Sequence, residues 1–248
     1  MNKPNGLSQP PSLQTLMREG PIALFLDFDG TLVELAAGPD AIALRPGLAD
    51  SLLKLADKLE GRLALVSGRS IENLQTFLGA LPITTAGSHG AAIRRADGTT
   101  LGREPEGIAK GAQDELRRFA SELGINLEGK THGAALHFRS APDLEPQAHA
   151  FADQIAAKYG LAAKRGKCVV ELVEQGADKG TAVHRIMAET PFAGATPWFL
   201  GDDVTDEDGF AACKSIGGGA VLVGERINTL ASHALPNVVA VHQWLEFE

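Results

Sequence analysis

The sequence contains only two cysteines, Cys168 and Cys213. Both stand in apolar surroundings, so we expect reduced core residues and neither a disulfide nor a cysteine metal site. No apolar run approaches the roughly 20 residues that a membrane-spanning helix needs. The N-terminal segment, residues 1–6, has no apolar core, so we expect no secretory signal there. These absences predict a cytoplasmic protein without a membrane partner.

Basic residues are also scarce relative to acidic ones. The chain has 23 lysines and arginines against 31 aspartates and glutamates, which gives a formal net charge of −8. Nucleic acid binding requires clustered positive charge, so this balance argues against nucleic acid as a partner. A length of 248 residues and a hydrophobic content of 44% allow one large globular domain or two modest ones.

What is present is organised around residues 22–32. The apolar run Ile22–Leu26 is typical of a strand buried on both faces, and it ends in Asp27 and Asp29, followed by Gly30. Side chains two residues apart on a strand project to the same side. Two carboxylates this close require a compensating cation or a shared proton. The simpler alternative is an Asp-rich turn that only caps a helix.

The rest of the chain alternates strand and helix patterns, with one interruption. Strand patterns over residues 62–66 and 81–86 each lead into or out of a helical pattern, which predicts a parallel sheet covered by helices. Residues 104–176 instead show the order helix, strand, strand, helix, strand, strand, with short turns typical of an antiparallel sheet. We therefore predict an α/β fold. It has a Rossmann-like parallel-sheet core, residues 1–103 and 177–248, and an inserted α+β cap domain, residues 104–176. A short strand is expected near Val238.

Three later sites lie where a strand ends or a helix begins. Ser67 follows a strand pattern and could hold a phosphate oxygen, although a helix N-cap is the simpler interpretation. Lys179 stands at a helix start, where a positive charge is unfavourable, so either a functional role or a solvated lysine is possible. Asp202 and Asp203, with Asp206, exceed what helix capping requires. Asp27, Asp29 and Asp202, with Asp206 as an additional candidate, offer oxygen ligands only, which suits Mg²⁺ better than Zn²⁺.

The order and spacing of these motifs resemble the haloacid-dehalogenase-like phosphohydrolase superfamily, in its branch with an inserted cap. More narrowly, the chain is similar to the trehalose-6-phosphate phosphatase family. The segments that carry the narrower resemblance are Val66–Arg69, Ala86–Ala91, Glu128–Lys130, Ala135–Arg139, Gly166–Glu171 and Gly201–Glu207. Two departures affect expected substrate contacts: Ala92 stands where the family often has glutamate, and Glu174-Gln175 replace a frequent basic-proline pair.

The resemblance implies a catalytic set composed of Asp27, Asp29, Ser67 and Lys179. Asp27 would attack phosphorus, Asp29 would act as acid and then base, and Ser67 and Lys179 would bind the phosphoryl oxygens. The Mg²⁺ ion would be held by Asp27, by the backbone carbonyl of Asp29 and by Asp202, with Asp206 in support.

The resemblance also implies a substrate-binding set, which comprises Arg69, His89, Glu128, Lys130 and Glu171. For the last three, a solvated face of a sheet is the structural alternative. The expected partner is a small sugar phosphate and the expected state is a monomer. Sucrose phosphate or a mannosyl-glycerate phosphate is an alternative substrate. A non-catalytic phospho-acceptor domain is a further alternative, as is a sugar-phosphate binding module.

Overall fold

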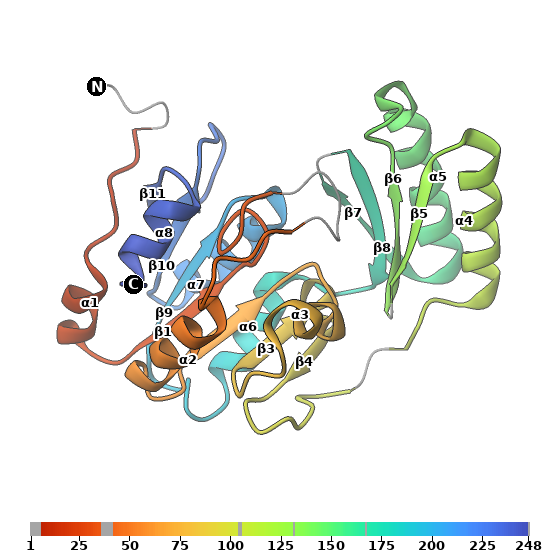
Figure 1. The fold of residues 1–248 in the computed structure, drawn as a ribbon. Helices are drawn as coiled ribbons and strands as arrows, with labels where there is room; N and C mark the ends of the chain where they lie inside the picture. Colours follow the sequence, from red (N-terminus) through yellow and green to blue (C-terminus); the bar gives the residue numbers. More distant parts are fainter. Residues whose placement is uncertain (1–5, 36–41, 104–105, 131, 167, 248) are drawn as a thin grey trace. The chain divides into compact units, whose positions relative to one another are not determined.

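The computed structural model describes residues 6–35, 42–103, 106–130, 132–166 and 168–247 (Figure 1). The chain divides into two compact units, the first made of Met1–Leu101 with Asp178–Glu248 and the second of Gly102–Ala177. Most of the N-terminal segment analysed for a secretory signal and the predicted domain-boundary residue 104 lie outside the described residues.

The first unit contains a seven-stranded sheet of order β11-β10-β9-β1-β2-β3-β4. All neighbouring strands are parallel except β3 and β4, which are antiparallel. This arrangement confirms the predicted α/β fold with a parallel core sheet. The strands are β1 (Ile22–Leu26), β2 (Leu63–Val66), β3 (Thr84–Gly87), β4 (Ala92–Arg94), β9 (Thr196–Gly201), β10 (Gly219–Val223) and β11 (His233–Leu235).

Strand β1 is central, and its side chains supply both cores of the first unit. Ile22, Leu24 and Leu26 belong to one buried cluster, whereas Ala23 and Phe25 belong to the other. Successive side chains of a strand point to opposite faces, so a strand covered by helices on both faces is apolar at every position. This is why residues 22–26 form a continuous apolar run.

Helices of the first unit cover the two faces of this sheet. Helices α1 (Leu13–Glu19), α2 (Leu48–Lys58), α3 (Ile71–Leu78) and α8 (Val238–Trp244) contribute to the first cluster. Helices α6 (Lys179–Met187) and α7 (Glu207–Ser215) contribute to the second.

The strand expected near Val238 was wrong, because residues 238–244 form helix α8. The Asn237 side chain accepts the backbone N–H of Ala240 and caps this helix. Val241 and Leu245 are four residues apart and belong to the first cluster, and Val238, one turn earlier, is also buried. Tertiary burial of that face therefore outweighs the strand preference of valine.

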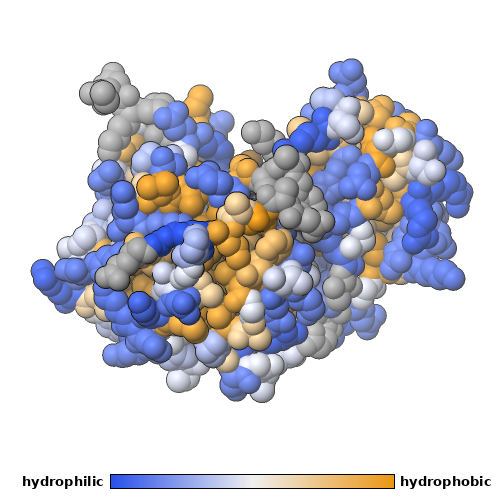
Figure 2. Space-filling view, in the orientation of Figure 1, coloured by the Kyte–Doolittle hydropathy of each residue, from blue (hydrophilic) through white to orange (hydrophobic). Residues whose placement is uncertain are grey.

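The second unit is an antiparallel four-stranded sheet of order β5-β6-β8-β7 with two helices. The elements are α4 (Lys110–Leu123), β5 (Asn126–Lys130), β6 (Gly133–His137), α5 (Glu145–Tyr159), β7 (Leu161–Gly166) and β8 (Val169–Glu174). Both helices share one apolar core with one face of the sheet, through residues such as Leu116, Leu136 and Leu172. The outer surface of α4 is hydrophilic (Figure 2). Because successive side chains of a strand point to opposite faces, the face of the sheet away from the helices carries the alternate side chains, including Glu128 and Glu171.

Two further sequence expectations concern membranes and cysteines. No helix among the described residues is long and apolar enough to cross a membrane. Both Cys168 and Cys213 are free thiols, and Cys213 is buried.

Two histidines of the first unit give stability a predictable pH dependence. Nε2 of His242 donates to the carbonyl oxygen of Leu32 at 2.9 Å, and His233 packs against the ring of Trp198. Burial lowers the pKa of both imidazoles below the ordinary value. The unfolded chain therefore binds more protons than the folded protein as the pH falls through about 6.5, and the free energy of unfolding falls with it.

We expect His242→Gln, which keeps a donor for Leu32, to lose less stability than the parent between about pH 7.5 and 5.5. The measurement is urea unfolding followed by tryptophan fluorescence. His184→Gln, at an exposed position of α6, serves as the control and should behave as the parent. Equal pH dependence in His242→Gln and the parent would contradict the assignment.

Candidate active site

Asp27 lies directly after β1, where this strand ends between β9 and β2. Leu26 is paired with Leu200 of β9, and the backbone N–H of Asp27 donates to the carbonyl of Leu200 at 3.0 Å. Asp202 follows the end of β9 and Ser67 the end of β2. Ligands of open α/β sheets bind beside the carboxyl ends of central strands, and all three residues stand at this edge of the sheet.

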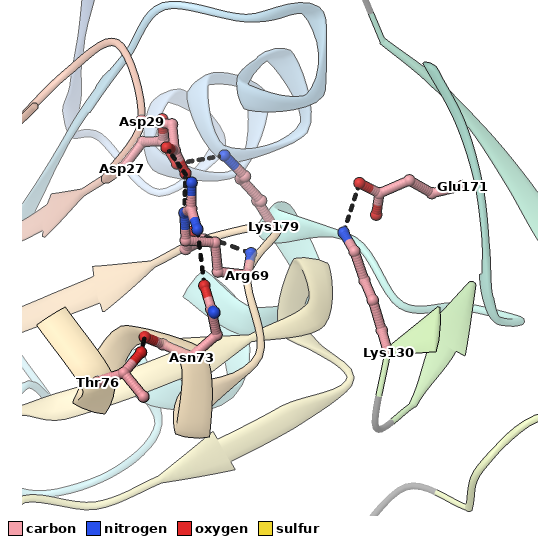
Figure 3. A network of polar contacts seen from close by, with 9 residues as sticks. Asp27, Asp29, Arg69, Asn73, Thr76, Lys130, Glu171 and Lys179 are labelled. Carbon is pink, nitrogen blue, oxygen red and sulfur yellow. Dashed lines mark hydrogen bonds and ion pairs between the residues drawn. The ribbon is translucent and has the colours of Figure 1, made fainter. Parts of the chain in front are cut away.

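Lys179 joins two carboxylates in the interior of this edge. Its Nζ atom lies 2.7 Å from Oδ1 of Asp27 and 2.6 Å from Oδ1 of Asp206. All three side chains are at least nine-tenths buried. Figure 3 shows Lys179 directed toward Asp27. The interpretation of Lys179 as a solvated lysine is therefore wrong. Its position at the start of α6 serves this contact, and the side chain of Asp178 caps the helix by accepting the N–H of Thr181.

Burial and crowding set the protonation of the cluster. Burial, together with the charges of Asp206 and Asp202, raises the pKa of Asp27 well above its usual range, although Lys179 opposes this. Burial and the neighbouring Asp206 and Asp203 raise the pKa of Asp202 to about 7. Burial alone would lower the pKa of Lys179, but the two carboxylates outweigh it and raise the pKa, so the amine stays charged. The carboxylates therefore need more positive charge than Lys179 supplies.

The cluster fits a divalent cation. Oxygen atoms of Asp27, Asp202 and Asp206 all lie within 4.8 Å of one another. Three ionised carboxylates face one ammonium group, which leaves a net charge of about −2. Two protons or one divalent cation would neutralise this charge. A Cβ atom at Gly30 would overlap the carboxylate of Asp202, and this glycine has a φ of +77°. Glycine at this position thus lets Asp202 approach the end of β1. Oxygen ligands alone suit Mg²⁺.

The acidic residues after β9 divide into capping and cluster residues. Oδ1 of Asp203 accepts the N–H of Val204 at 2.7 Å, and Oδ2 of Asp206 accepts the N–H of Asp203 at 2.8 Å. Asp203 therefore caps the short helix Val204–Asp206, whereas Asp202 faces Asp27 and Asp206 in the cluster. Capping accounts for Asp203 but not for Asp202.

The carboxylate of Asp29 is paired with the guanidinium of Arg69. Its carboxylate accepts from Nε of Arg69 at 2.6 Å and from Nη2 at 2.8 Å. The Arg69 guanidinium also donates to Asn73 (Figure 3). It lies over the ring of Phe77 as well, 5.2 Å from the ring centroid. The two-pronged ion pair holds the Asp29 carboxylate in a defined orientation. No local pattern in the sequence indicates the pairing of Asp29 with Arg69.

Ser67 is buried, and its hydroxyl oxygen accepts the N–H of Arg69 at 3.1 Å. The N-cap of α3 is Ser70, so helix capping does not explain Ser67. Ser88 and His89 both have positive φ values, and their N–H groups donate to the carbonyls of Arg69 and Ser67. This strained turn braces the segment that follows β2, and the His89 ring lies where a side chain at Gly68 would stand.

The predicted residues of the second unit share one face of its sheet. Glu128 and Glu171 are both paired with Ala135, so they lie in one row across β5, β6 and β8. Nζ of Lys130 contacts Oε1 of Glu171 at 2.6 Å, and both side chains are largely buried (Figure 3). Glu128 contacts Nε2 of His137 at 2.8 Å, and this hydrogen bond lowers the pKa of Glu128. The four side chains therefore form two polar pairs rather than a freely solvated face.

Sequence reasoning missed two polar partners and left two departures open. The first missed residue is His137, the partner of Glu128. It lies two residues after Ala135 on the same strand, so alternation along the strand places it on the same face. The second is Asn73, the partner of Arg69, which no local pattern indicates. Ala92 is buried in β4, and Glu174 ends β8 and forms an ion pair with Arg103.

Comparisons with known proteins agree with this arrangement. A trehalose-phosphatase family model matches residues 25–232. Trehalose-6-phosphate phosphatase of Escherichia coli is 39% identical over 227 residues, which cover 90% of this chain and 85% of that protein. A probable trehalose-phosphate phosphatase of Sinorhizobium fredii is 36% identical over 219 residues, which cover 87% of this chain and 82% of that protein.

A crystal structure of a trehalose-6-phosphate phosphatase related protein has a TM-score of 0.73 at 26% identity, covering 91% of this chain and 96% of that one. The family match spans strands β2 to β10. It includes the carboxylate cluster with Lys179 and the polar pairs on the sheet of the second unit. The chain therefore belongs to the trehalose-phosphatase family and is an enzyme of that family.

Proposed function

We propose that this enzyme hydrolyses trehalose 6-phosphate to trehalose and phosphate, with Mg²⁺ as cofactor and a phosphorylated Asp27 as intermediate. The observation that carries the proposal is the position of Asp27, which directly follows the central strand and contacts Lys179 beside the carboxylates of Asp202 and Asp206. Membership of the trehalose-phosphatase family supports the choice of substrate.

The residues that would hold Mg²⁺ are Asp27, Asp202 and the backbone carbonyl of Asp29, with Asp206 in support. When bound, the ion neutralises the excess negative charge of the cluster, so that a phosphate dianion can approach. Lys179 serves the same purpose from within the protein, because its ammonium group touches Asp27. The hydroxyl hydrogen of Ser67 can donate to a phosphoryl oxygen, since the hydroxyl oxygen already accepts from Arg69.

The reaction has two steps. An Oδ atom of Asp27 attacks phosphorus, and the bond from phosphorus to the sugar oxygen breaks while Asp29 gives that oxygen a proton. Asp29 then takes a proton from water, the water oxygen attacks phosphorus, and the Asp27–phosphorus bond breaks to release phosphate. The ion pair with Arg69 must open for Asp29 to exchange these protons, because both of its oxygens accept from the guanidinium.

The second unit would supply sugar recognition. Carboxylates and an ammonium group on one sheet face, here Glu128, Lys130 and Glu171, are suitable partners for sugar hydroxyls, because charged groups form the stronger hydrogen bonds. The pairs that they form in this structure hold their side chains in defined positions. This preorganisation favours binding of a polar ligand.

Phosphate release from trehalose 6-phosphate, sucrose phosphate and glucose 6-phosphate tests the proposal. We expect preference for trehalose 6-phosphate, and a loss of roughly a hundredfold or more after chelation that Mg²⁺ restores. Preference for sucrose phosphate would replace the proposed substrate. Full turnover after exhaustive chelation would exclude the metal, and no release from any of these phosphates would favour a binding module.

The variant Lys130→Ala tests the role of the second unit. We expect kcat/KM for trehalose 6-phosphate to fall about 10- to 100-fold, because one charged hydrogen bond to the sugar is lost. Hydrolysis of p-nitrophenyl phosphate, which has no sugar, should change less than about twofold. The control is Lys158→Ala, which removes another lysine–glutamate pair of this unit, with Glu115, on its helices. Equal losses on both substrates would contradict a role in sugar binding.

A further inference from the structure

Arg226 connects a loop outside the carboxylate cluster to the main chain of a cluster residue. It lies between β10 and β11, and its Nη1 atom donates to the backbone carbonyl oxygen of Asp202 at 3.2 Å. Its Nη2 atom forms an ion pair with Oε1 of Glu207, the first residue of α7. The side chains of Arg226 and Glu207 are each only 20% exposed. Partial burial makes such a pair better ordered than a surface ion pair.

Glu207 extends this connection to the other end of the loop. Its second oxygen, Oε2, accepts the backbone N–H of Leu230 at 2.7 Å. One carboxylate thus ties both Arg226 and Leu230 to the start of α7. The loop is anchored at two points, so the guanidinium that it carries is held in place against Asp202.

The main chain at Asp202 is where such support is needed. Asp202 immediately follows β9 and precedes the short helix that Asp203 caps. Its carboxylate is held close to those of Asp27 and Asp206, a crowded arrangement that electrostatic repulsion opposes. A hydrogen bond to its carbonyl resists rotation of the peptide that would turn the carboxylate away.

We propose that Arg226 is a positioning residue for the cation site. It fixes the backbone of Asp202, so that the carboxylate meets those of Asp27 and Asp206 before the ion binds. This positioning role rests on the proposed function in one respect, because the proposed function identifies the ion as Mg²⁺. Outer partners of metal ligands typically change metal affinity 10- to 100-fold when removed.

The test is the dissociation constant of Mg²⁺ alone, measured by calorimetry on the substrate-free full chain. We expect Arg226→Met to weaken binding about tenfold or more, and Arg226→Lys, which can still donate to the carbonyl, to weaken it less. The matched control is Arg95→Met. Arg95 also pairs with a glutamate, Glu189, and donates to a backbone carbonyl, that of Thr100, in the same unit. This control should bind Mg²⁺ within about twofold of the parent.

An Arg226→Met protein that binds Mg²⁺ within about twofold of the parent would overturn the proposal, as would an equal loss in Arg95→Met. If Arg226→Met does not fold, Glu207→Gln provides the same test. It keeps an acceptor for Leu230 but weakens the hold on Arg226, so weaker Mg²⁺ binding is again expected. Hydrolysis of trehalose 6-phosphate is assayed on the parent alone. A parent that binds Mg²⁺ but does not hydrolyse this ester would refute the proposed function. The positioning role would still be tested by the ratio of the Mg²⁺ dissociation constants of the variant and the parent.

Discussion

The variant Asp27→Asn is expected to lose at least about 10³-fold in turnover of trehalose 6-phosphate. An amide oxygen is a far poorer nucleophile than a carboxylate, and the proposed intermediate is an ester of this side chain. Stability should not fall with activity. Burial and the neighbouring Asp206 and Asp202 raise the pKa of Asp27, which means that the folded protein disfavours its charge. A neutral amide of the same shape therefore relieves repulsion.

Two measurements separate these effects. Phosphate release gives the turnover, and urea unfolding followed by tryptophan fluorescence gives the stability of the first unit, which contains both Trp198 and Trp244. The control is Asp57→Asn, at an exposed position of α2, which should retain full activity. Residual activity above about a tenth of the parent in Asp27→Asn would refute the covalent route.

The variant Lys179→Met is expected to lose both activity and stability. Its ammonium group is buried between Asp27 and Asp206, so its removal leaves two buried carboxylates without this partner. Breaking a buried ion pair by removing one member typically costs about 3–5 kcal/mol of unfolding free energy. Turnover should fall by at least about 10²-fold, since the phosphoryl group loses an ammonium group that contacts the nucleophile.

The double variant Lys179→Met with Asp206→Asn shows whether the loss comes from uncompensated charge. We expect it to be more stable than the sum of the two single changes implies, because the amide needs no counter-charge. Lys58→Met serves as the surface control. Its partner Glu246 and Lys58 itself are each 38% exposed, so the change should cost less than about 1 kcal/mol. Comparable losses for Lys58→Met and Lys179→Met would show that the burial of Lys179 has no energetic role.

Local patterns were sufficient to predict the fold class, and the order of the motifs was sufficient to indicate the family. The apolar run Ile22–Leu26 predicted a central strand because a strand buried on both faces has no polar positions. The change from alternating strands and helices to paired short strands predicted the separate antiparallel sheet, since short turns cannot join parallel strands. The positions of Asp27, Ser67, Lys179 and Asp202 at strand and helix ends were also readable, because local patterns fix where elements stop.

Tertiary structure alone decided which side chains meet. It paired Asp29 with Arg69, assigned Asp203 to capping and Asp202 to the cluster, and placed Arg226 against a carbonyl 24 residues away. It also turned residues 238–244 into a helix against the preference of their valines. Local patterns report the conformation of the backbone over a few residues. Ion pairs and burial depend on distances between segments remote in the chain, and those distances exist only once the sheet has assembled.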